Sequence, residues 1–335
     1  MIRVAINGCG RIGRIAFREM ITSSDYDIVA VNDLSTPEEL AHLIKYDTVH
    51  RSFHKDAILF DNEIIVISGK KKIRVFSEVD PTNLPWKELN VDLVLECTGK
   101  FTTVEEASKH ITAGAKKVLI SAPGKGEMKT IVYGVNENTL DGSETVISSS
   151  SCTTNCLAPL LKVINDNFKI IKGFMITVHS FTNDQVTLDI SHKKGIKARR
   201  GRSASQNIIP ASTGAASSIG LVIPELMGKM DGNSYRVPTP DGSLVDVTLE
   251  LSRNTTVEEI NSVIKNNESD SLKLTMDPIV SSDVIGEPYG SVVDGLLTNI
   301  VESDGKQLVK IVSWYDNEFG YTCQMLRVAK SMFKS

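Results

Sequence analysis

The first 150 residues alternate short apolar runs with amphipathic segments. Ile2–Asn7 and 28–32 are apolar runs of strand length, and Arg11–Thr22 between them has the periodicity of a helix. Further strand or helix patterns follow at 92–96, 104–113 and 117–121, with short apolar pieces at 130–133 and 145–147. Strands separated by helices require crossover connections. This half therefore predicts an α/β domain with a mostly parallel, doubly wound sheet.

The pattern changes after residue 150. Apolar and polar residues alternate strictly over 245–251, which is typical of an antiparallel sheet with one face in solvent. Thr256 and Glu259 have the spacing of a capping box at the start of a helix. Other helix or strand patterns occupy 157–165, 172–179, 307–314 and 321–332. The second half predicts an α+β domain with a mostly antiparallel sheet. In the first half, the alternating stretch 53–76 predicts a hairpin insertion.

Length and composition narrow the class of protein. The chain has 335 residues, which favours two domains because domains average ~150 residues. Apolar residues make up 41% and charged residues 23%, as in ordinary globular proteins. This mix excludes a disordered acidic tail, a collagen-like rod and a small disulfide scaffold. No segment approaches the ~20 apolar residues that cross a bilayer, so we expect no membrane partner.

The N-terminus and the cysteines bear on location. Met1 leads directly into a strand pattern, without the layout of a signal peptide. The five cysteines are odd in number and sparse, which favours reduced thiols. We therefore expect a cytoplasmic protein.

The net charge of −4 hides an uneven distribution. The segment 192–202 holds six Lys or Arg residues and no acid, so the remaining chain carries −10. Such a run is usually a solvated face or a nucleic-acid patch. The near-neutral total argues against a dedicated nucleic-acid partner. The position of this basic segment after a predicted strand instead favours contact with a phosphorylated substrate or with another subunit.

A glycine-rich turn joins the first predicted strand to the first predicted helix. Gly8, Gly10 and Gly13 permit a tight turn and let backbone amides approach a pyrophosphate at the helix N-terminus. Asp33 follows the second strand, where a carboxylate accepts hydrogen bonds from a ribose and repels a 2′-phosphate. If the glycines served only to form a sharp turn, the acidic residue Asp33 after the second strand would have no explanation. The sequence predicts a Rossmann-type site for NAD, and Ser121, which also follows a strand, is expected along the same crevice.

Cys152 is the candidate nucleophile. It follows a run of serines and precedes an apolar segment, so it is expected in the first turn of a helix. There the helix dipole favours a thiolate and lowers the cysteine pKa. His179, at the end of a predicted strand among small polar residues, is the candidate base, although spacing alone does not establish the pair. A zinc site is the alternative, but four convincing ligands are missing, so we expect no metal. The other cysteines are interpreted as small core residues.

Two further positions have anion-binding character. The segment 212–216 has the pattern of a loop-to-helix anion cradle. Arg236 is an isolated cation in a polar setting. Without further context, Arg236 is better interpreted as a surface arginine.

Taken together, these motifs resemble those of the phosphorylating glyceraldehyde-3-phosphate dehydrogenases over essentially the whole chain. The resemblance is carried by the segments 6–14, 31–34, 151–156, 177–180, 212–216 and 313–318. It implies NAD-dependent oxidation and phosphorylation of glyceraldehyde 3-phosphate to 1,3-bisphosphoglycerate, a step of glycolysis. Cys152 would form a hemithioacetal, His179 would remove a proton as hydride leaves for NAD⁺, and inorganic phosphate would split the resulting thioester.

The resemblance also implies roles for individual residues. The phosphate of the substrate would lie near Thr182 and Arg236. The attacking phosphate would lie near Ser151, Thr153, Thr213 and Gly214. NAD would be held by Gly8, Gly10, Arg11, Ile12, Gly13, Asp33, Ser121 and Asn317, with Asn317 on the nicotinamide amide.

An organisation into domains and subunits is implied as well. Residues 1–151 and 315–335 would form an NAD-binding Rossmann domain, to which the C-terminal helix returns, and residues 152–314 a catalytic domain. The protein would be a homotetramer in which the basic segment lines the cofactor pocket of a neighbouring subunit. Which of Arg199, Arg200 and Arg202 contacts phosphate is left open.

Three positions depart from the pattern of the family. Cys9 stands in the glycine turn where Phe is usual and introduces a thiol open to oxidation. Val79 replaces a common Arg on the adenine side, which puts one cofactor contact in question. Ser191 stands where NAD-specific members commonly have Pro and NADP-using relatives often have Ser. Because Asp33 points to NAD, we predict a clear preference for NAD with some tolerance of NADP.

Three other functions compete with this interpretation. An erythrose-4-phosphate dehydrogenase resembles the same family but releases a free acid. A non-phosphorylating aldehyde dehydrogenase is less favoured, because it would bind no phosphate in the anion pocket at Ser151, Thr153 and Thr213. A binding protein that uses the basic segment belongs to a different class. The Cys152–His179 pair disfavours binding as the main role of the protein. Binding stays open as a secondary role.

Overall fold

The computed structural model describes residues 1–53, 58–61, 64–67, 71–192 and 195–333. The chain forms two compact units. The first contains Met1–Ile131, Glu137–Ser150 and Met325–Ser335, and the second contains Val132–Asn136 and Ser151–Gln324. The chain therefore returns to the first unit at Met325 and not at residue 315. The strand that ends at Tyr315 belongs to the sheet of the second unit, and the start of the following helix stays with that sheet.

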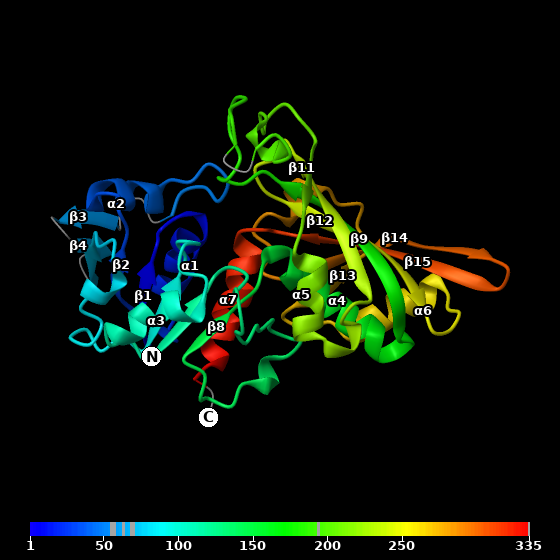
Figure 1. Ribbon diagram of the computed structural model, residues 1–335, viewed down its shortest axis with the longest axis horizontal. Coiled ribbons are helices and arrows are strands. Elements are labelled where there is room, and N and C mark those ends of the chain that lie inside the picture. Colours follow the sequence, from blue (N-terminus) through cyan, green and yellow to red (C-terminus); the bar gives the residue numbers. More distant parts are fainter. Residues whose placement is uncertain (54–57, 62–63, 68–70, 193–194, 334–335) are drawn as a thin grey trace. The chain divides into compact units, whose positions relative to one another are not determined.

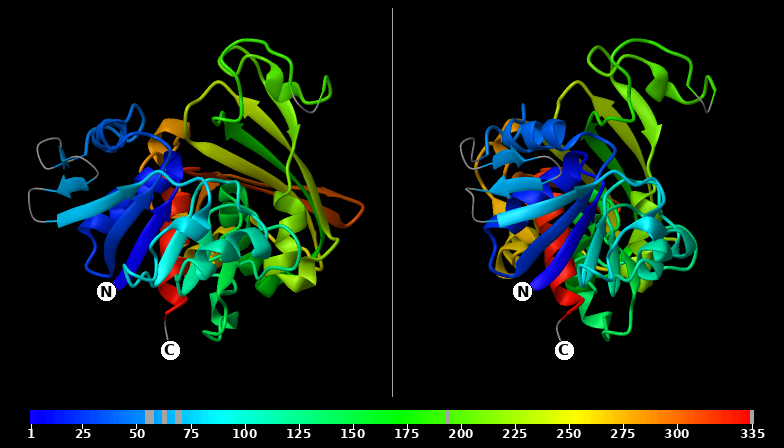
Figure 2. Two further views of the ribbon diagram at one scale, coloured as in Figure 1. Left: turned by 60° about the vertical axis from the view of Figure 1, so that its left-hand side comes forward. Right: turned by 90° about the vertical axis from the view of Figure 1, so that its left-hand side faces the viewer.

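The first unit is built on an eight-stranded sheet with the order β3-β4-β5-β2-β1-β6-β7-β8 (Figures 1 and 2). Its strands are β1 (Ile2–Asn7), β2 (Tyr26–Asn32), β3 (Ile58–Asp61), β4 (Ile64–Ile67), β5 (Lys71–Phe76), β6 (Leu93–Glu96), β7 (Lys117–Ile120) and β8 (Val146–Ser148). The strands from β5 to β8 in this order are parallel, and β3 and β4 add an antiparallel edge. The predicted parallel sheet and hairpin insertion are confirmed. Parts of the insertion, at 54–57, 62–63 and 68–70, lie outside the described residues.

The helices of the first unit begin in two different ways. They are α1 (Arg11–Thr22), α2 (Pro37–Lys45), α3 (Val104–Thr112) and the end of α7 (Phe319–Ser331). α2 and α3 each begin with a complete capping box, at Thr36 and at Thr103. The N-cap of α1 is Gly10, which has no side chain to accept a hydrogen bond. The first turn of α1 therefore keeps backbone N–H groups for another partner.

The second unit contains a seven-stranded sheet with the order β10-β11-β9-β12-β15-β14-β13. Its strands are β9 (Ile170–Ser180), β10 (Ile209–Ser212), β11 (Met230–Val237), β12 (Ser243–Leu251), β13 (Leu272–Thr275), β14 (Ser291–Ser303) and β15 (Lys306–Tyr315). The β9–β11 and β13–β14 pairs are parallel and the other neighbours are antiparallel. The predicted, mostly antiparallel sheet is confirmed.

The two faces of this second sheet differ. The helices α4 (Cys152–Phe168), α5 (Ala215–Val222) and α6 (Val257–Asn266) share one hydrophobic core with the sheet, and Val245, Val247 and Leu249 of β12 are fully buried in it. The residues between them are only half-buried, as the alternation predicted. The outer face is not purely polar, because Phe174 and Ile176 of β9 lie opposite these half-buried residues and are 69% and 41% exposed.

Some local expectations are met only in part. The apolar piece at 130–133 forms no strand, and Thr130 makes an isolated bridge to Ser148. At α6, the Thr256 hydroxyl accepts a hydrogen bond from the Glu259 N–H, but the Glu259 carboxylate turns to Arg253 at 2.7 Å. The predicted capping box is therefore half formed, because a nearby cation offers the carboxylate a stronger partner. Within the described part of the chain, no helix combines the length and apolar character needed to span a membrane.

Candidate active site

Cys152 is the first residue of α4, as the sequence predicts. Ser151 is the N-cap, and its Oγ accepts a hydrogen bond from the Thr154 N–H at 3.1 Å. The apolar residues that follow are buried in the core of the second unit and anchor the helix there. The Cys152 side chain therefore lies beside the partial positive charge of a fixed helix N-terminus.

His179 lies next to Cys152 near the end of β9. The Cys152 Sγ and the His179 Nε2 are 3.3 Å apart. β9 runs parallel to β11, and their register places Arg236 opposite His179. A helix and two strands of the second unit thus bring three of the predicted residues together.

The hydrogen bonds of His179 decide which ring nitrogen carries the hydrogen. Its Nδ1 lies 2.7 Å from the carbonyl oxygen of Ser180, which can only accept, and 3.1 Å from the Arg236 Nη1, which can only donate. Because the contact with the carbonyl is the shorter one and the Arg236 Nη1 donates to the same oxygen, we assign the hydrogen of the neutral ring to Nδ1. Nε2 then directs its lone pair at the Cys152 thiol. Tyr315 packs edge-on against the imidazole with ring centroids 5.9 Å apart and restricts its rotation. The pair is arranged for proton transfer from sulfur to Nε2.

Burial governs the charge of this pair. It lowers the pKa of His179 to about 3, and the Arg236 guanidinium acts in the same direction. Burial also raises the pKa of the Cys152 thiol above its ordinary value, and Arg236 and Thr153 oppose this only in part. The prediction of a lowered Cys152 pKa is therefore wrong, because desolvation outweighs the helix N-terminus. Both shifts favour the neutral thiol and the neutral imidazole over a thiolate–imidazolium pair.

Arg236 has hydrogen-bond capacity to spare. Its Nη1 donates to the Ser180 carbonyl oxygen at 2.9 Å and to the Thr182 hydroxyl oxygen at 3.0 Å. Its Nε–H is buried and has no hydrogen-bond partner among the described residues. A half-buried cation beside a hydroxyl suits an anionic group such as phosphate. Arg236 is thus a half-buried site residue and not the surface arginine that its local sequence favours.

The basic segment contributes Arg200 to the surroundings of this site. Arg200 pairs closely with Asp184, whose other oxygen accepts a hydrogen bond from the Thr182 hydroxyl. The Arg200 charge also helps to lower the pKa of the imidazole. Arg202 pairs with a different aspartate and is largely exposed. Sequence analysis missed Asp184, although an acid within two residues of Thr182 is a signal for such a pair.

Thr153 turns its hydroxyl toward the protein interior. The hydroxyl is 2.9 Å from the Tyr315 hydroxyl, which is also 2.9 Å from the Thr177 hydroxyl. Tyr315 therefore ties α4 to β9 behind the Cys152–His179 pair. Sequence analysis did not single out Tyr315, and its only signal is its place in the motif 313–318.

Thr213 and Gly214 form the predicted turn before α5. The Thr213 hydroxyl oxygen accepts the first N–H of α5 at 3.2 Å, and a Cβ at Gly214 would meet open space. Ser212 lies opposite Asn233, three residues before Arg236 on β11. At ~3.3 Å per residue, this offsets the turn by roughly 10 Å along the strand. The turn therefore lies near the Cys152–His179–Arg236 cluster without forming part of it.

Asn317 is buried in the second unit in a defined orientation. The Ser243 Oγ accepts a hydrogen bond from the Ser180 N–H at 3.1 Å, so its own hydrogen is donated to the Asn317 Oδ1 at 2.6 Å. The Asn317 NH₂ group is left to donate elsewhere. This fits the predicted contact with the carboxamide of a nicotinamide.

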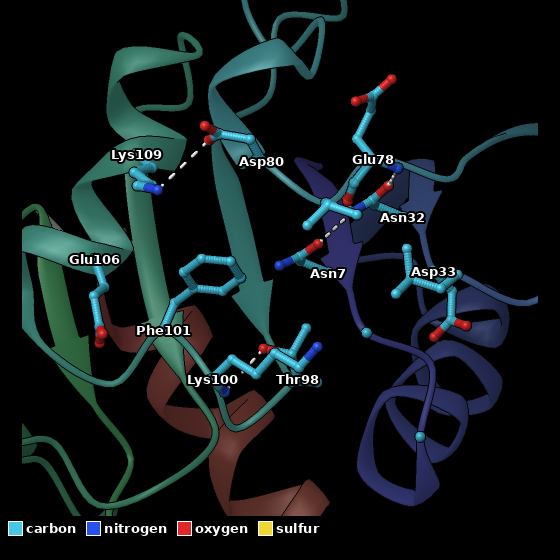
Figure 3. Close-up of a pocket in the computed structure, with 15 residues that line it drawn as sticks. Asn7, Asn32, Asp33, Glu78, Asp80, Thr98, Lys100, Phe101, Glu106 and Lys109 are labelled. Atoms are coloured by element: carbon cyan, nitrogen blue, oxygen red, sulfur yellow. Dashed lines mark hydrogen bonds and ion pairs between the residues drawn. The ribbon is translucent and has the colours of Figure 1, made fainter.

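A second candidate site is a pocket of about 660 Å³ in the first unit (Figure 3). Gly8, Gly10 and Asp33 line one side, and Thr98 and Phe101 line the other. These residues follow the carboxyl ends of β1, β2 and β6. Ligands of open parallel sheets bind at this edge, where the strand order reverses.

Two glycines of the turn beside the pocket, Gly8 and Gly13, have no room for a Cβ. Gly8 has φ +90°, and a Cβ there would lie 2.8 Å from the Thr98 backbone nitrogen. A Cβ at Gly13 would lie 2.1 Å from the Gly8 carbonyl oxygen. Gly10 faces open space at the start of α1, whose first turn contains no acidic residue. The turn therefore exposes backbone amides in a way that fits a pyrophosphate.

Asp33 and Arg11 differ in what they offer a dinucleotide. Asp33 accepts hydrogen bonds from the Cys9 N–H at 2.7 Å and the Ser35 N–H at 2.9 Å, which hold its carboxylate at the pocket. This position fits a ribose diol and disfavours a 2′-phosphate. The Arg11 guanidinium is bound at two points by Asp47. Because Asp47 engages this guanidinium, the predicted contact of Arg11 with a pyrophosphate would use its backbone N–H.

Four other positions of interest lie in the first unit. The side chains of Ile12 and Ser121 do not line the described pocket. Ile12 lies in the first turn of α1, where its backbone N–H is the group suited to a ligand. Ser121 hydrogen-bonds the thiol of Cys97, and Cys97 does line the pocket. Val79 lines the pocket and is 75% exposed. Burial, with Asp33, raises the pKa of Cys9 well above its ordinary value. The Cys9 thiol is therefore poorly suited to the oxidation expected from its sequence position.

Comparisons with known proteins match two family models to this chain. The family model described as the NAD binding domain of glyceraldehyde 3-phosphate dehydrogenase matches residues 2–104. The model described as the C-terminal domain of the same enzyme matches residues 151–317.

Three curated relatives, each named glyceraldehyde-3-phosphate dehydrogenase, are similar over nearly their whole length. The protein from Clostridium pasteurianum is 53% identical over 100% of this chain and 99% of its own length. The protein from Clostridium acetobutylicum is 53% identical over 98% of this chain and 97% of its own length. The protein from Streptococcus pyogenes is 48% identical over 100% and 99%, respectively.

Proposed function

The chain belongs to the glyceraldehyde 3-phosphate dehydrogenase family and is an NAD-dependent oxidoreductase, and from this premise we propose how its residues carry out the reaction. The reaction is the oxidation of glyceraldehyde 3-phosphate to a cysteine thioester, followed by phosphorolysis to 1,3-bisphosphoglycerate. The observation that carries this proposal is the 3.3 Å contact between the Cys152 thiol and the unprotonated Nε2 of His179.

The first half of the reaction forms the thioester. The Cys152 sulfur attacks the aldehyde carbon while His179 Nε2 accepts the thiol proton, and that proton then completes the hydroxyl of a hemithioacetal. NAD, when bound, accepts the hydride that leaves this carbon. His179 removes the hydroxyl proton in the same step, which leaves an acyl group on sulfur. N–H groups in the first turn of α4 stabilise the negative charge that develops on the substrate oxygen.

The second half uses inorganic phosphate as the proposed nucleophile. A phosphate oxygen attacks the thioester carbon, the carbon–sulfur bond breaks, and Cys152 regains a proton from His179. Arg236 and Thr182 would hold the phosphate of the substrate, as their 3.0 Å contact and the unused Arg236 donor support. Ser151, Thr153, Thr213 and Gly214 are the residues proposed to hold the attacking phosphate.

An absorbance assay for NADH tests this proposal. The enzyme is supplied with glyceraldehyde 3-phosphate and NAD, with and without inorganic phosphate. We expect sustained NADH formation only when phosphate is present, because phosphate releases the acyl group from Cys152. Undiminished turnover without phosphate would refute phosphorolysis and favour an enzyme that releases a free acid, such as an erythrose-4-phosphate dehydrogenase.

A homotetramer is the proposed assembly. The outer face of the second sheet exposes Phe174 and the cross-strand pair Val301 and Leu308, and Phe174 and Leu308 line a pocket of about 340 Å³. In the basic segment 192–202, of which 193–194 lie outside the described residues, Ile196 is fully exposed. Covering these side chains with another copy would remove apolar surface from water. Light scattering of the native protein should give the mass of four chains per particle, and Phe174→Asp should lower the particle mass. A native protein with the mass of one chain would contradict the proposed assembly.

The free cysteines support a reducing compartment, and we place the enzyme in the cytoplasm on that basis. The basic segment gives no specific support for a second binding function. Arg200 and Arg202 are paired with Asp184 and Asp189, which weakens the positive potential that a nucleic acid would need.

A further inference from the structure

A set of buried polar side chains lies beneath the dinucleotide pocket, with Glu96 at its centre. Glu96 ends β6 and is 1% exposed. Its Oε2 accepts hydrogen bonds from Asn7 Nδ2 at 2.5 Å and from His110 Nε2 at 3.0 Å. Its Oε1 accepts hydrogen bonds from the Thr98 N–H at 2.8 Å and from the Thr98 hydroxyl. The carboxylate thus receives four donors from three different elements of the first unit.

Trp86 decides the protonation of His110 at one end of this network. An indole N–H can only donate, and the Trp86 Nε1 lies 3.0 Å from the His110 Nδ1. Nδ1 is therefore unprotonated, the hydrogen is on Nε2, and the ring is neutral. The 3.3 Å contact between Asn7 Nδ2 and His110 Nε2 is then an approach of two donors that share one oxygen of Glu96.

Asn32 orients the network at its other end. The Glu78 N–H donates to the Asn32 Oδ1 at 2.8 Å, and a backbone N–H can only donate. The Asn32 Nδ2 must then donate to the Glu78 carbonyl oxygen at 2.9 Å and to the Asn7 Oδ1 at 2.7 Å (Figure 3). Asn7 is left to present its Nδ2 to Glu96. Every donor therefore points toward the carboxylate, which identifies Glu96 as ionised.

An ionised carboxylate in this position depends on all of its donors. The ionisable side chain that contacts Glu96 in the described part of the first unit is the neutral His110. Hydrogen bonds must therefore replace the hydration that burial removes. A displacement of Asn7 or Thr98 would leave part of the charge unsolvated, so the carboxylate holds both residues in place.

The residues held by Glu96 belong to opposite walls of the pocket. Asn32 and Glu78 line one wall, and Thr98, followed by Phe101, lines the other (Figure 3). We propose that Glu96 is a positioning residue for NAD, whose ionised carboxylate sets the spacing between the segment after β5 and the loop after β6. The affected part of the cofactor is the adenosine half, because Asp33 marks the same pocket as the ribose site.

The variant Glu96→Gln tests this role with cofactor affinity and not turnover as the readout. An amide at position 96 has one acceptor oxygen, so its NH₂ group would face the Asn7 and His110 donors in one orientation and the Thr98 N–H in the other. We expect calorimetry to show dissociation constants for NAD and for ADP-ribose that rise at least tenfold. Leu95→Val is the matched control, because Leu95 is fully buried in the same strand outside the pocket lining. This control should leave both constants within twofold of the native values.

The double variant Asn7→Asp with Glu96→Gln separates positioning from a general loss of structure. The new carboxylate at position 7 would face the new amide, accept from Asn32, and lie 3.3 Å from the His110 donor. The amide oxygen at position 96 would keep both Thr98 donors. We expect the NAD dissociation constant to return to within threefold of the native value.

Three outcomes would overturn the proposal. They are native NAD affinity in Glu96→Gln, an equal loss of affinity in Leu95→Val, and a double variant that binds no better than Glu96→Gln. If Glu96→Gln does not fold, Trp86→Phe decides the matter. It removes the N–H that fixes the His110 tautomer and should weaken NAD binding threefold or more; unchanged affinity would overturn the proposal.

Discussion

Arg236→Leu is the sharpest test of how the active site selects its substrate. In the structure, the Arg236 Nη1 bonds the Ser180 carbonyl oxygen and the Thr182 hydroxyl oxygen, while the Nε–H is buried without a partner among the described residues. A substrate phosphate next to Thr182 would therefore meet a donor that is already oriented and desolvated. Leucine keeps most of the side-chain volume but removes the charge and every donor.

The expected magnitude follows from the strength of a charge-assisted hydrogen bond. Such a bond contributes about 1.5–3 kcal/mol, and each ~1.4 kcal/mol corresponds to a tenfold change in rate. Arg236→Leu should thus lower kcat/KM for glyceraldehyde 3-phosphate by roughly 10- to 150-fold. Glyceraldehyde without a phosphate makes no such contact and loses only the electrostatic effect of Arg236 on Cys152 and His179, so its kcat/KM should fall by a clearly smaller factor.

The assay compares both substrates at saturating NAD by the absorbance of NADH. Arg202→Leu is the matched control, because Arg202 is largely exposed and pairs with Asp189. It should retain kcat/KM within about twofold for both substrates, as expected of an exposed ion pair. An equal loss on both substrates in Arg236→Leu would refute the assignment of Arg236 to the substrate phosphate.

Three further predictions concern the nucleophile, the base and the cofactor. Cys152→Ser should lower turnover by several orders of magnitude and leave the calorimetric affinity for NAD unchanged, and retained turnover would mean that another residue is the nucleophile. Because the pKa of His179 falls from 6.5 to about 3 on folding, the unfolded chain binds a proton there that the folded one does not, and this group should lower the free energy of unfolding with a slope that approaches about 1.4 kcal/mol per pH unit as the pH falls from 6.5 toward 3. Urea unfolding of His179→Asn should show a smaller decrease between pH 7 and pH 5, and an identical pH dependence would contradict the lowered pKa. The native enzyme should prefer NAD with some turnover of NADP, and Asp33→Ser should reduce the ratio of kcat/KM for NAD over NADP by tenfold or more; an unchanged ratio would remove Asp33 from cofactor selection.

The electrostatics of the active site show where inference from the sequence fails. The position of Cys152 in the first turn of a helix is a local property, and it was predicted. The direction of its pKa shift was not, because it depends on desolvation by residues distant in the chain, which outweighs the opposing charge of Arg236. A helix dipole is visible in a sequence, whereas the desolvation that outweighs it is not.

Tertiary contacts also change the meaning of single residues. Arg236 has the local sequence of a surface arginine, and the β9–β11 register places it, half-buried, beside His179. Arg11 stands in the glycine motif as an apparent cofactor cation, yet Asp47 binds its guanidinium. Their local sequences do not reveal these partners, because each lies tens of residues away in the chain.

The sequence by itself determined the parallel and antiparallel sheets, the glycine turn that leaves α1 uncapped, and the helix that begins at Cys152. These features arise from preferences that act over a few neighbouring residues: apolar periodicity, the steric freedom of glycine, and capping by serine. Only the tertiary structure decided that His179 is the partner of Cys152, that burial favours the neutral form of both, and that Glu96 receives donors from Asn7, 89 positions away. Strand register and burial create those contacts, and both depend on the packing of the whole domain.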